Sequence, residues 1–138
     1  MKITKYLLVF ALVATLLSLC YREVLSFGVA HRYTGIIGLA SVLYFVTMFA
    51  AGWITGYKEA RYLPIADIGF RWHLTTYLIF MAVGILWYTL GYAAPNESIV
   101  TLWHTALSWG ILLFIHFIFY LWRRHKSIKG LKKEEIFE

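Results

Sequence analysis

The chain has few charges, only one cysteine and two prolines in 138 residues. Charged residues make up 14% of it and hydrophobic residues 61%, whereas soluble domains average about 25% charged. This composition excludes a disordered regulator and a typical nucleic-acid-binding domain. The lone Cys20 cannot form an internal disulfide, and no CxxCH motif is present to attach a c-type haem. We therefore predict an integral membrane protein of one domain, residues 1–138.

Four apolar runs are each long enough to cross a bilayer, which takes about 20 residues per helix. They predict helices over about 4–22, 32–56, 71–94 and 98–122, followed by a basic tail at 123–138. The first run resembles a signal peptide, but Leu19 makes a poor cleavage site, so we expect a retained helix. Short links between successive helices predict an all-α, up-down-up-down bundle of four transmembrane helices.

Basic residues predict the orientation, because cytoplasmic loops carry the excess of lysine and arginine. With a cytoplasmic amino terminus, the outer side receives only Arg22 and Arg32. The cytoplasmic side receives eleven basic residues: Lys2, Lys5, Lys58, Arg61, Arg71, Arg123, Arg124, Lys126, Lys129, Lys132 and Lys133. We expect both termini to be cytoplasmic in a protein of the cell membrane. The tail could contact anionic lipid headgroups, and no nucleic-acid partner is expected.

Four of the five histidines lie in or at the mouths of the predicted helices, and His125 lies in the tail. Ionisable side chains in a membrane are costly and by default signal a function. The predicted spans contain no Asp or Glu, so a proton or cation path built on carboxylates is not expected. By depth, the histidines form an outer pair, His31 with His104, and an inner pair, His73 with His116. Twelve residues separate the two on the last helix, a rise of about 18 Å and a rotation of about 120°.

Two facing imidazoles inside an apolar bundle suit the axial ligation of haem b. The pairs therefore predict two bis-His haems, with His31, His104, His73 and His116 as iron ligands. Bis-His ligation leaves no open position on the iron and favours electron transfer over oxygen chemistry. We expect Arg32 to pair with the outer haem propionates, and Arg71 or Arg61 with the inner ones.

Two stretches resemble known membrane cytochromes. His-Arg-Tyr-Thr-Gly at 31–35 is similar to a helix opening in the bacterial cytochrome b561 and ferric-reductase-like families. Leu-Trp-His-Thr at 102–105, continuing to Ile-His-Phe at 115–117, is similar to their double-histidine helix. The resemblance implies a dihaem carrier of electrons linked to quinol. Those families often place two ligands on the first histidine-bearing helix, where this chain has Phe45, so His73 could replace the inner one.

Several interpretations stay open from the residues alone. The leading one is an electron-transfer subunit that connects a quinone pool with a redox partner subunit of a larger respiratory complex. A stand-alone quinone reductase or a homo-oligomer is a variant of it. A single haem on His104 or His116 is also possible. A non-redox membrane scaffold or assembly subunit, whose histidines only join helices, is the alternative from another class. Metal transport is disfavoured, because no acidic or thiolate ligands accompany the histidines.

Overall fold

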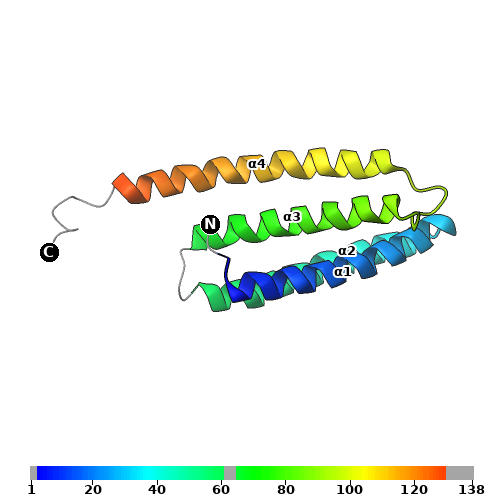
Figure 1. The fold of residues 1–138 in the computed structure, drawn as a ribbon, viewed down its shortest axis with the longest axis horizontal. Coiled ribbons are helices and arrows are strands. Elements are labelled where there is room, and N and C mark those ends of the chain that lie inside the picture. The colour runs from blue at the N-terminus through cyan, green and yellow to red at the C-terminus, as the bar shows by residue number, and fades with distance from the viewer. Residues whose placement is uncertain (1–2, 61–64, 130–138) are drawn as a thin grey trace.

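A computed structural model of the chain describes residues 3–60 and 65–129. These residues form four α-helices: α1 (Lys5–Ala30), α2 (Thr34–Glu59), α3 (Ile65–Thr89) and α4 (Ile99–Lys129). Successive helices run in opposite directions, so α1 begins and α4 ends at the same end of the bundle (Figure 1). We call this the terminal end, and the end with the α1–α2 turn and the α3–α4 loop the loop end. The predicted all-α four-helix architecture is confirmed.

All four helices are long and apolar enough to cross a membrane, over Lys5–Ala30, Thr34–Glu59, Gly69–Thr89 and Ile99–Arg123. Most of their surface faces outward, and only 6% of the most apolar stretch is buried in the second and the fourth span. Exposed leucine, isoleucine and phenylalanine side chains cover this surface. Such a surface suits hydrocarbon rather than water, so the chain is a four-span integral membrane protein.

The four helices are not packed equally. α1 lies along α2 and also packs on α3, whereas α2 touches α3 over a short stretch. Among the described helices, α4 packs on α3 alone, which leaves it on one side of the bundle (Figure 1). Two clusters of buried side chains hold these contacts: Leu7, Phe10, Ala14, Met48 and Trp72 between α1, α2 and α3, and Phe80, Met81, Leu102 and Ala106 between α3 and α4.

At the loop end, α1 and α3 end at other residues than expected. α1 continues past Arg22 to Ala30, because Arg22 is buried and paired instead of marking a membrane surface. α3 ends at Thr89, before Pro95, because Gly91 takes a left-handed conformation with φ +77°. The Gly91 and Tyr92 amides donate to the Tyr88 and Trp87 carbonyls, the hydrogen-bond pattern of a glycine-terminated helix.

At the terminal end the helices also run further than expected. α2 continues to Glu59, α3 begins at Ile65, and α4 continues through the first basic residues to Lys129. Lysine and arginine are good helix formers, so the charge that ends an apolar run does not end the helix. The rest of the predicted tail, 130–138, lies outside the described residues, as does Arg61.

Candidate functional site

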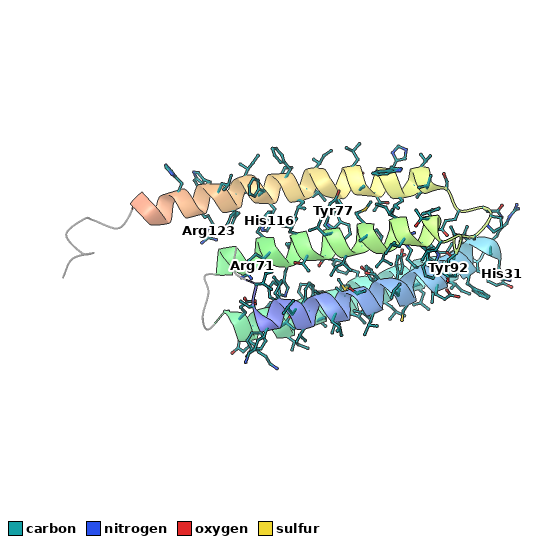
Figure 2. All side chains as sticks on the ribbon, viewed as in Figure 1. His31, Arg71, Tyr77, Tyr92, His116 and Arg123 are labelled. Atoms are coloured by element: carbon teal, nitrogen blue, oxygen red, sulfur yellow. The ribbon has the colours of Figure 1, made fainter. Side chains whose placement is uncertain are left out.

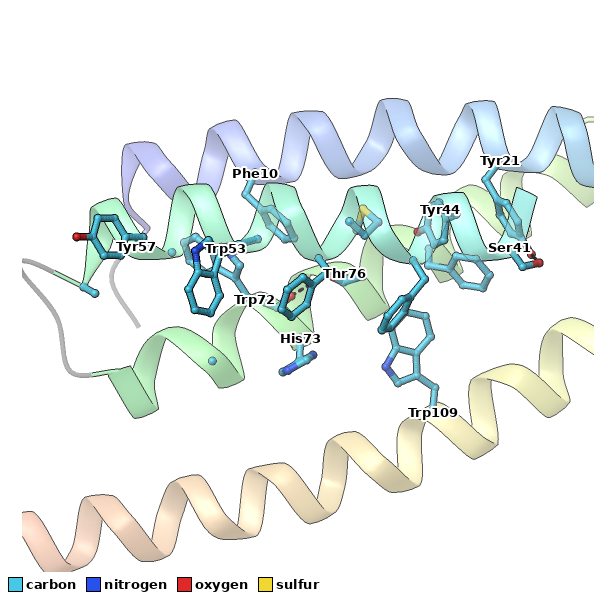
Figure 3. Close-up of a pocket in the computed structure, with 18 residues that line it drawn as sticks. Phe10, Tyr21, Ser41, Tyr44, Trp53, Tyr57, Trp72, His73, Thr76 and Trp109 are labelled. Carbon is cyan, nitrogen blue, oxygen red and sulfur yellow. Dashed lines mark hydrogen bonds between the residues drawn. The ribbon is translucent and has the colours of Figure 1, made fainter. Parts of the chain in front are cut away.

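His73 on α3 and His116 on α4 lie together near the terminal end. Their ring centroids are 5.1 Å apart, and the rings meet edge to face at 60°. His73 extends from α3 on the side that faces α4 (Figure 3). A Cβ added to Gly69 would lie 3.8 Å from His116 Nε2. The absence of a side chain at Gly69, one turn before His73, thus lets the His116 ring approach the α3 backbone.

Aromatic rings surround the His116 side of this pair. Phe70 stacks on His116 with 6.1 Å between centroids and on Tyr120 with 5.1 Å. Phe117 contacts both Phe70 and Tyr120. Phe70 is buried, His116 is half-buried and His73 is exposed. The two imidazoles therefore meet in an apolar aromatic setting that remains open on one side.

The outer pair of histidines is not brought together. His31 caps the carboxyl end of α1 instead of opening α2; its Nδ1 lies 2.9 Å from the Phe27 carbonyl oxygen. Its ring packs between Phe27 and Tyr33 at the loop end, where it is exposed (Figure 2). His104 is exposed on α4. Since α4 packs on α3 alone within the described chain, nothing draws His104 toward the α1–α2 turn.

The two arginines expected near the haems differ in surroundings. Arg32 is exposed in the α1–α2 turn, in a left-handed conformation with φ 57°. Arg71 is buried, and its Nη1 donates to Glu59 Oε1 at 3.3 Å. Glu59 is only 1% exposed, and its Oε2 accepts no hydrogen bond within the described residues. Sequence reasoning missed Glu59, because the expected end of the second helix at residue 56 placed it in a loop.

A second buried ion pair, also missed, lies at the loop end. Arg22 Nη1 on α1 donates to Glu97 Oε1 in the α3–α4 loop at 3.0 Å, and both side chains are under 10% exposed. Ser26 donates to Glu97 Oε2 at 2.7 Å, and Trp87 Nε1 donates to Ser26 at 2.9 Å. The only signal for this ion pair in the sequence is Arg22, an arginine that directly follows an apolar run. The structure shows that the helix continues past it. This cluster joins α1 to α3 and to the loop beyond it.

A long groove of about 660 Å³ runs beside the histidine pair, mostly between α2 and α3 (Figure 3). Such a volume is in the range of small-molecule sites. His73 and Gly69 lie at its edge, and Trp109 of α4 reaches into it. The rest of its lining comes from α1, α2 and α3: Phe10, Tyr21, Ser41, Tyr44, Phe45, Met48, Phe49, Gly52, Trp53, Gly56, Tyr57, Ala60, Trp72, Thr76 and Phe80.

The donor set of the inner pair fits the axial ligation of a haem iron. It offers two imidazoles from neighbouring helices, in a setting of apolar rings. The rings touch in the structure, so haem binding requires α3 and α4 to move apart at this point and the rings to turn, so that a flat macrocycle could lie between them. The outer pair shows no such ring contact among the described residues: His31 caps α1, and His104 is exposed on α4. Among the described residues, no group of three or more His, Cys, Asp or Glu side chains could hold a metal ion.

Comparison with protein-family models, with curated proteins and with solved structures finds no match for this chain. The function must therefore be argued from the residues and their geometry.

Proposed function

We propose that this four-span membrane protein is a b-type cytochrome that carries a haem between His73 and His116. The observation that carries the proposal is the contact of two imidazoles from adjacent transmembrane helices, with 5.1 Å between ring centroids. Histidines inside a membrane are rare and by default functional. This pair also has the surroundings that a macrocycle requires, since Phe70, Phe117 and Tyr120 are apolar aromatic neighbours.

A haem held by His73 and His116 would supply a reversible one-electron couple. The protein's own residues bind and orient it. His73 and His116 each offer an imidazole nitrogen, and the rings of Phe70, Phe117 and Tyr120 make one side of the site apolar. Because Arg71 is held by Glu59, we assign it to the stability of the terminal end rather than to a propionate.

The packing of α4 supports the entry of a ligand between α3 and α4. Within the described chain the backbone of α4 lies close to that of α3 alone, so a separation of the two helices would disturb few backbone contacts of α4 with the rest of the bundle. The proposal covers the inner pair alone; the outer haem expected on His31 and His104 has no such support. We retain a quinone pool and a redox partner, in a larger complex or a homo-oligomer, as the proposed donor and acceptor, and cytoplasmic termini as the proposed orientation.

The test is the absorption spectrum of the purified protein with a pyridine haemochrome count. We expect a Soret band, a sharp α-band on reduction, and one haem per chain. His116→Ala and His73→Ala should each lose the haem, whereas the matched controls His31→Ala and His104→Ala should keep it. A colourless, fully helical wild type would overturn the proposal, and so would full haem content in His116→Ala.

A non-redox scaffold subunit is the second candidate. This candidate explains the direct contact of the His73 and His116 rings without any movement of α3 and α4. Polar contacts between membrane helices contribute about 0.6–2 kcal/mol each. If this candidate holds, His116→Ala lowers the thermal stability of a protein that never contained haem. The same samples thus distinguish the two candidates.

A further inference from the structure

The groove between α2 and α3 is long and narrow. Along α2 its lining runs from Ser41 to Ala60, which at 1.5 Å per residue is a length of about 28 Å. A volume of 660 Å³ over that length gives a mean cross-section of about 23 Å². Carbon atoms in contact lie about 3.5–4.0 Å apart, so a single hydrocarbon chain needs a channel about 5 Å wide, or roughly 20 Å². The volume and the length of the groove thus suit one extended hydrocarbon chain, and the length is close to the thickness of the hydrocarbon core, about 30 Å.

Five of the nine polar side chains that line the groove make hydrogen bonds within the protein. The Tyr21 and Tyr44 hydroxyls lie 3.1 and 2.9 Å from the hydroxyls of Ser41 and Ser18. Trp72 Nε1 donates to the Gly52 carbonyl at 3.1 Å. The Thr76 hydroxyl donates to the Trp72 carbonyl at 2.9 Å. A ligand with a polar group inside the groove would need polar side chains that point inward and fix its orientation. These walls therefore suit an aliphatic chain better than such a ligand.

One side of the groove opens toward the bilayer. Phe45, Phe49, Trp53 and Tyr57 line it along α2, and each remains more than 60% exposed. A chain can therefore enter sideways from the membrane, and no helix has to move. In the close-up Trp53 and Trp72 lie between Tyr44 and Tyr57 (Figure 3).

The terminal end of the groove carries positive charge. Tyr57 and Ala60 line this end, and Lys58, which follows Tyr57 in the last turn of α2, is exposed next to the groove in sequence but does not line it. Lys5 opens α1 at the same end and is exposed. The neighbouring Glu59 and Arg71 neutralise each other. Among the described residues, the two lysines thus offer uncompensated charge to an anionic headgroup, an interaction of about 1 kcal/mol per residue near a membrane surface.

We propose that this groove binds one anionic phospholipid, with an acyl chain along α2 and α3 and its phosphate beside Lys58. The lipid fills the space that the short α2–α3 contact leaves open, and so acts as a structural part of the bundle. The inference needs only the membrane location of the chain and is independent of the haem proposal.

The probe is a set of vesicles containing phosphatidylglycerol, phosphatidylcholine and a long-chain prenylquinone in equal parts. Reconstituted protein is extracted into mild detergent and its bound molecules are counted by native mass spectrometry. We expect one phosphatidylglycerol retained per chain. Thr76→Trp, which fills the groove, should reduce retention at least fivefold. Leu112→Trp, the matched control on the exposed face of α4, should retain the lipid. Lys58→Glu should bind phosphatidylglycerol and phosphatidylcholine alike.

Three results would overturn the proposal: retention of the prenylquinone in place of the phospholipid, a lipid-free mass of two chains, or equal lipid retention in Thr76→Trp and the wild type. Circular dichroism checks that each variant is helical. If Thr76→Trp does not fold, Thr76→Leu fills part of the groove and should still reduce retention at least twofold; unchanged retention in it counts against the site.

Discussion

Arg22 and Glu97 stand 75 residues apart in the chain and are joined by a buried hydrogen-bonded ion pair of 3.0 Å. The pair joins α1 to the loop that connects α3 with α4. Arg22 also lies over the Phe80 ring, 5.3 Å from its centroid. A charge removed from water at such a place is stable only with its partner, so this contact is central to the stability of the loop end.

Removal of one partner should therefore destabilise the protein strongly. Arg22→Ala leaves the Glu97 carboxylate without its cation, and breaking a buried pair costs about 3–5 kcal/mol. We expect a clear fall in the thermal midpoint of the protein in detergent, measured by circular dichroism. Arg32→Ala, an exposed arginine at the same end, is the control and should change the midpoint little. Equal midpoints for the two variants would contradict a structural role for the pair.

Gly84 should tolerate no side chain, because it lies against Arg22. An added Cβ would lie 2.6 Å from Arg22 Nη2 and 2.8 Å from Leu102 Cδ1. Overpacking of this kind costs about 1–3 kcal/mol, and Glu97 holds Arg22 so that it cannot move away freely. We expect Gly84→Ala to lower the free energy of unfolding.

The matched control is Gly38→Ala in α2, where an added Cβ meets nothing within 4 Å. Alanine is the better helix former by about 1 kcal/mol, so Gly38→Ala should be neutral or slightly stabilising. A Gly84→Ala variant as stable as Gly38→Ala would show that α3 can shift away from α1.

Gly69 offers a graded test of the histidine site. Its Cβ would lie 3.8 Å from His116 Nε2, an ordinary contact, so Gly69→Ala should preserve the site. Gly69→Leu should displace the His116 ring. We expect at least a fivefold lower haem content per folded chain in Gly69→Leu and near-normal content in Gly69→Ala, measured as pyridine haemochrome. Equal haem content in the two variants would show that haem binding does not depend on the close approach of the His116 ring to the α3 backbone at Gly69.

The proposed orientation can be tested by cysteine labelling in cells. Cys20 is exposed on α1, so the labelling variants are made in a Cys20→Ala background. Ser98→Cys, in the exposed part of the α3–α4 loop, should react with a membrane-impermeant maleimide on intact cells. His125→Cys, near the exposed end of α4, should react only after permeabilisation. The reverse pattern would show that the basic residues do not set the topology.

Hydropathy was sufficient to predict the four membrane helices, their alternation and the all-α fold. A span needs about 20 apolar residues whatever lies around it, so this signal is local. The bounds were harder to predict. Charges near an apolar run ordinarily mark a membrane surface, but Arg22 and Glu59 are buried with partners from distant parts of the chain. Local sequence does not show such partners.

The sequence by itself thus determined the helices and their number, because hydrophobic length depends only on neighbouring residues. Only the tertiary structure decided which helices pack together. α4 rests on α3 alone, so His73 meets His116 while His31 and His104 remain apart. That choice follows from close packing and from two buried ion pairs, which depend on residues brought together only when the bundle forms.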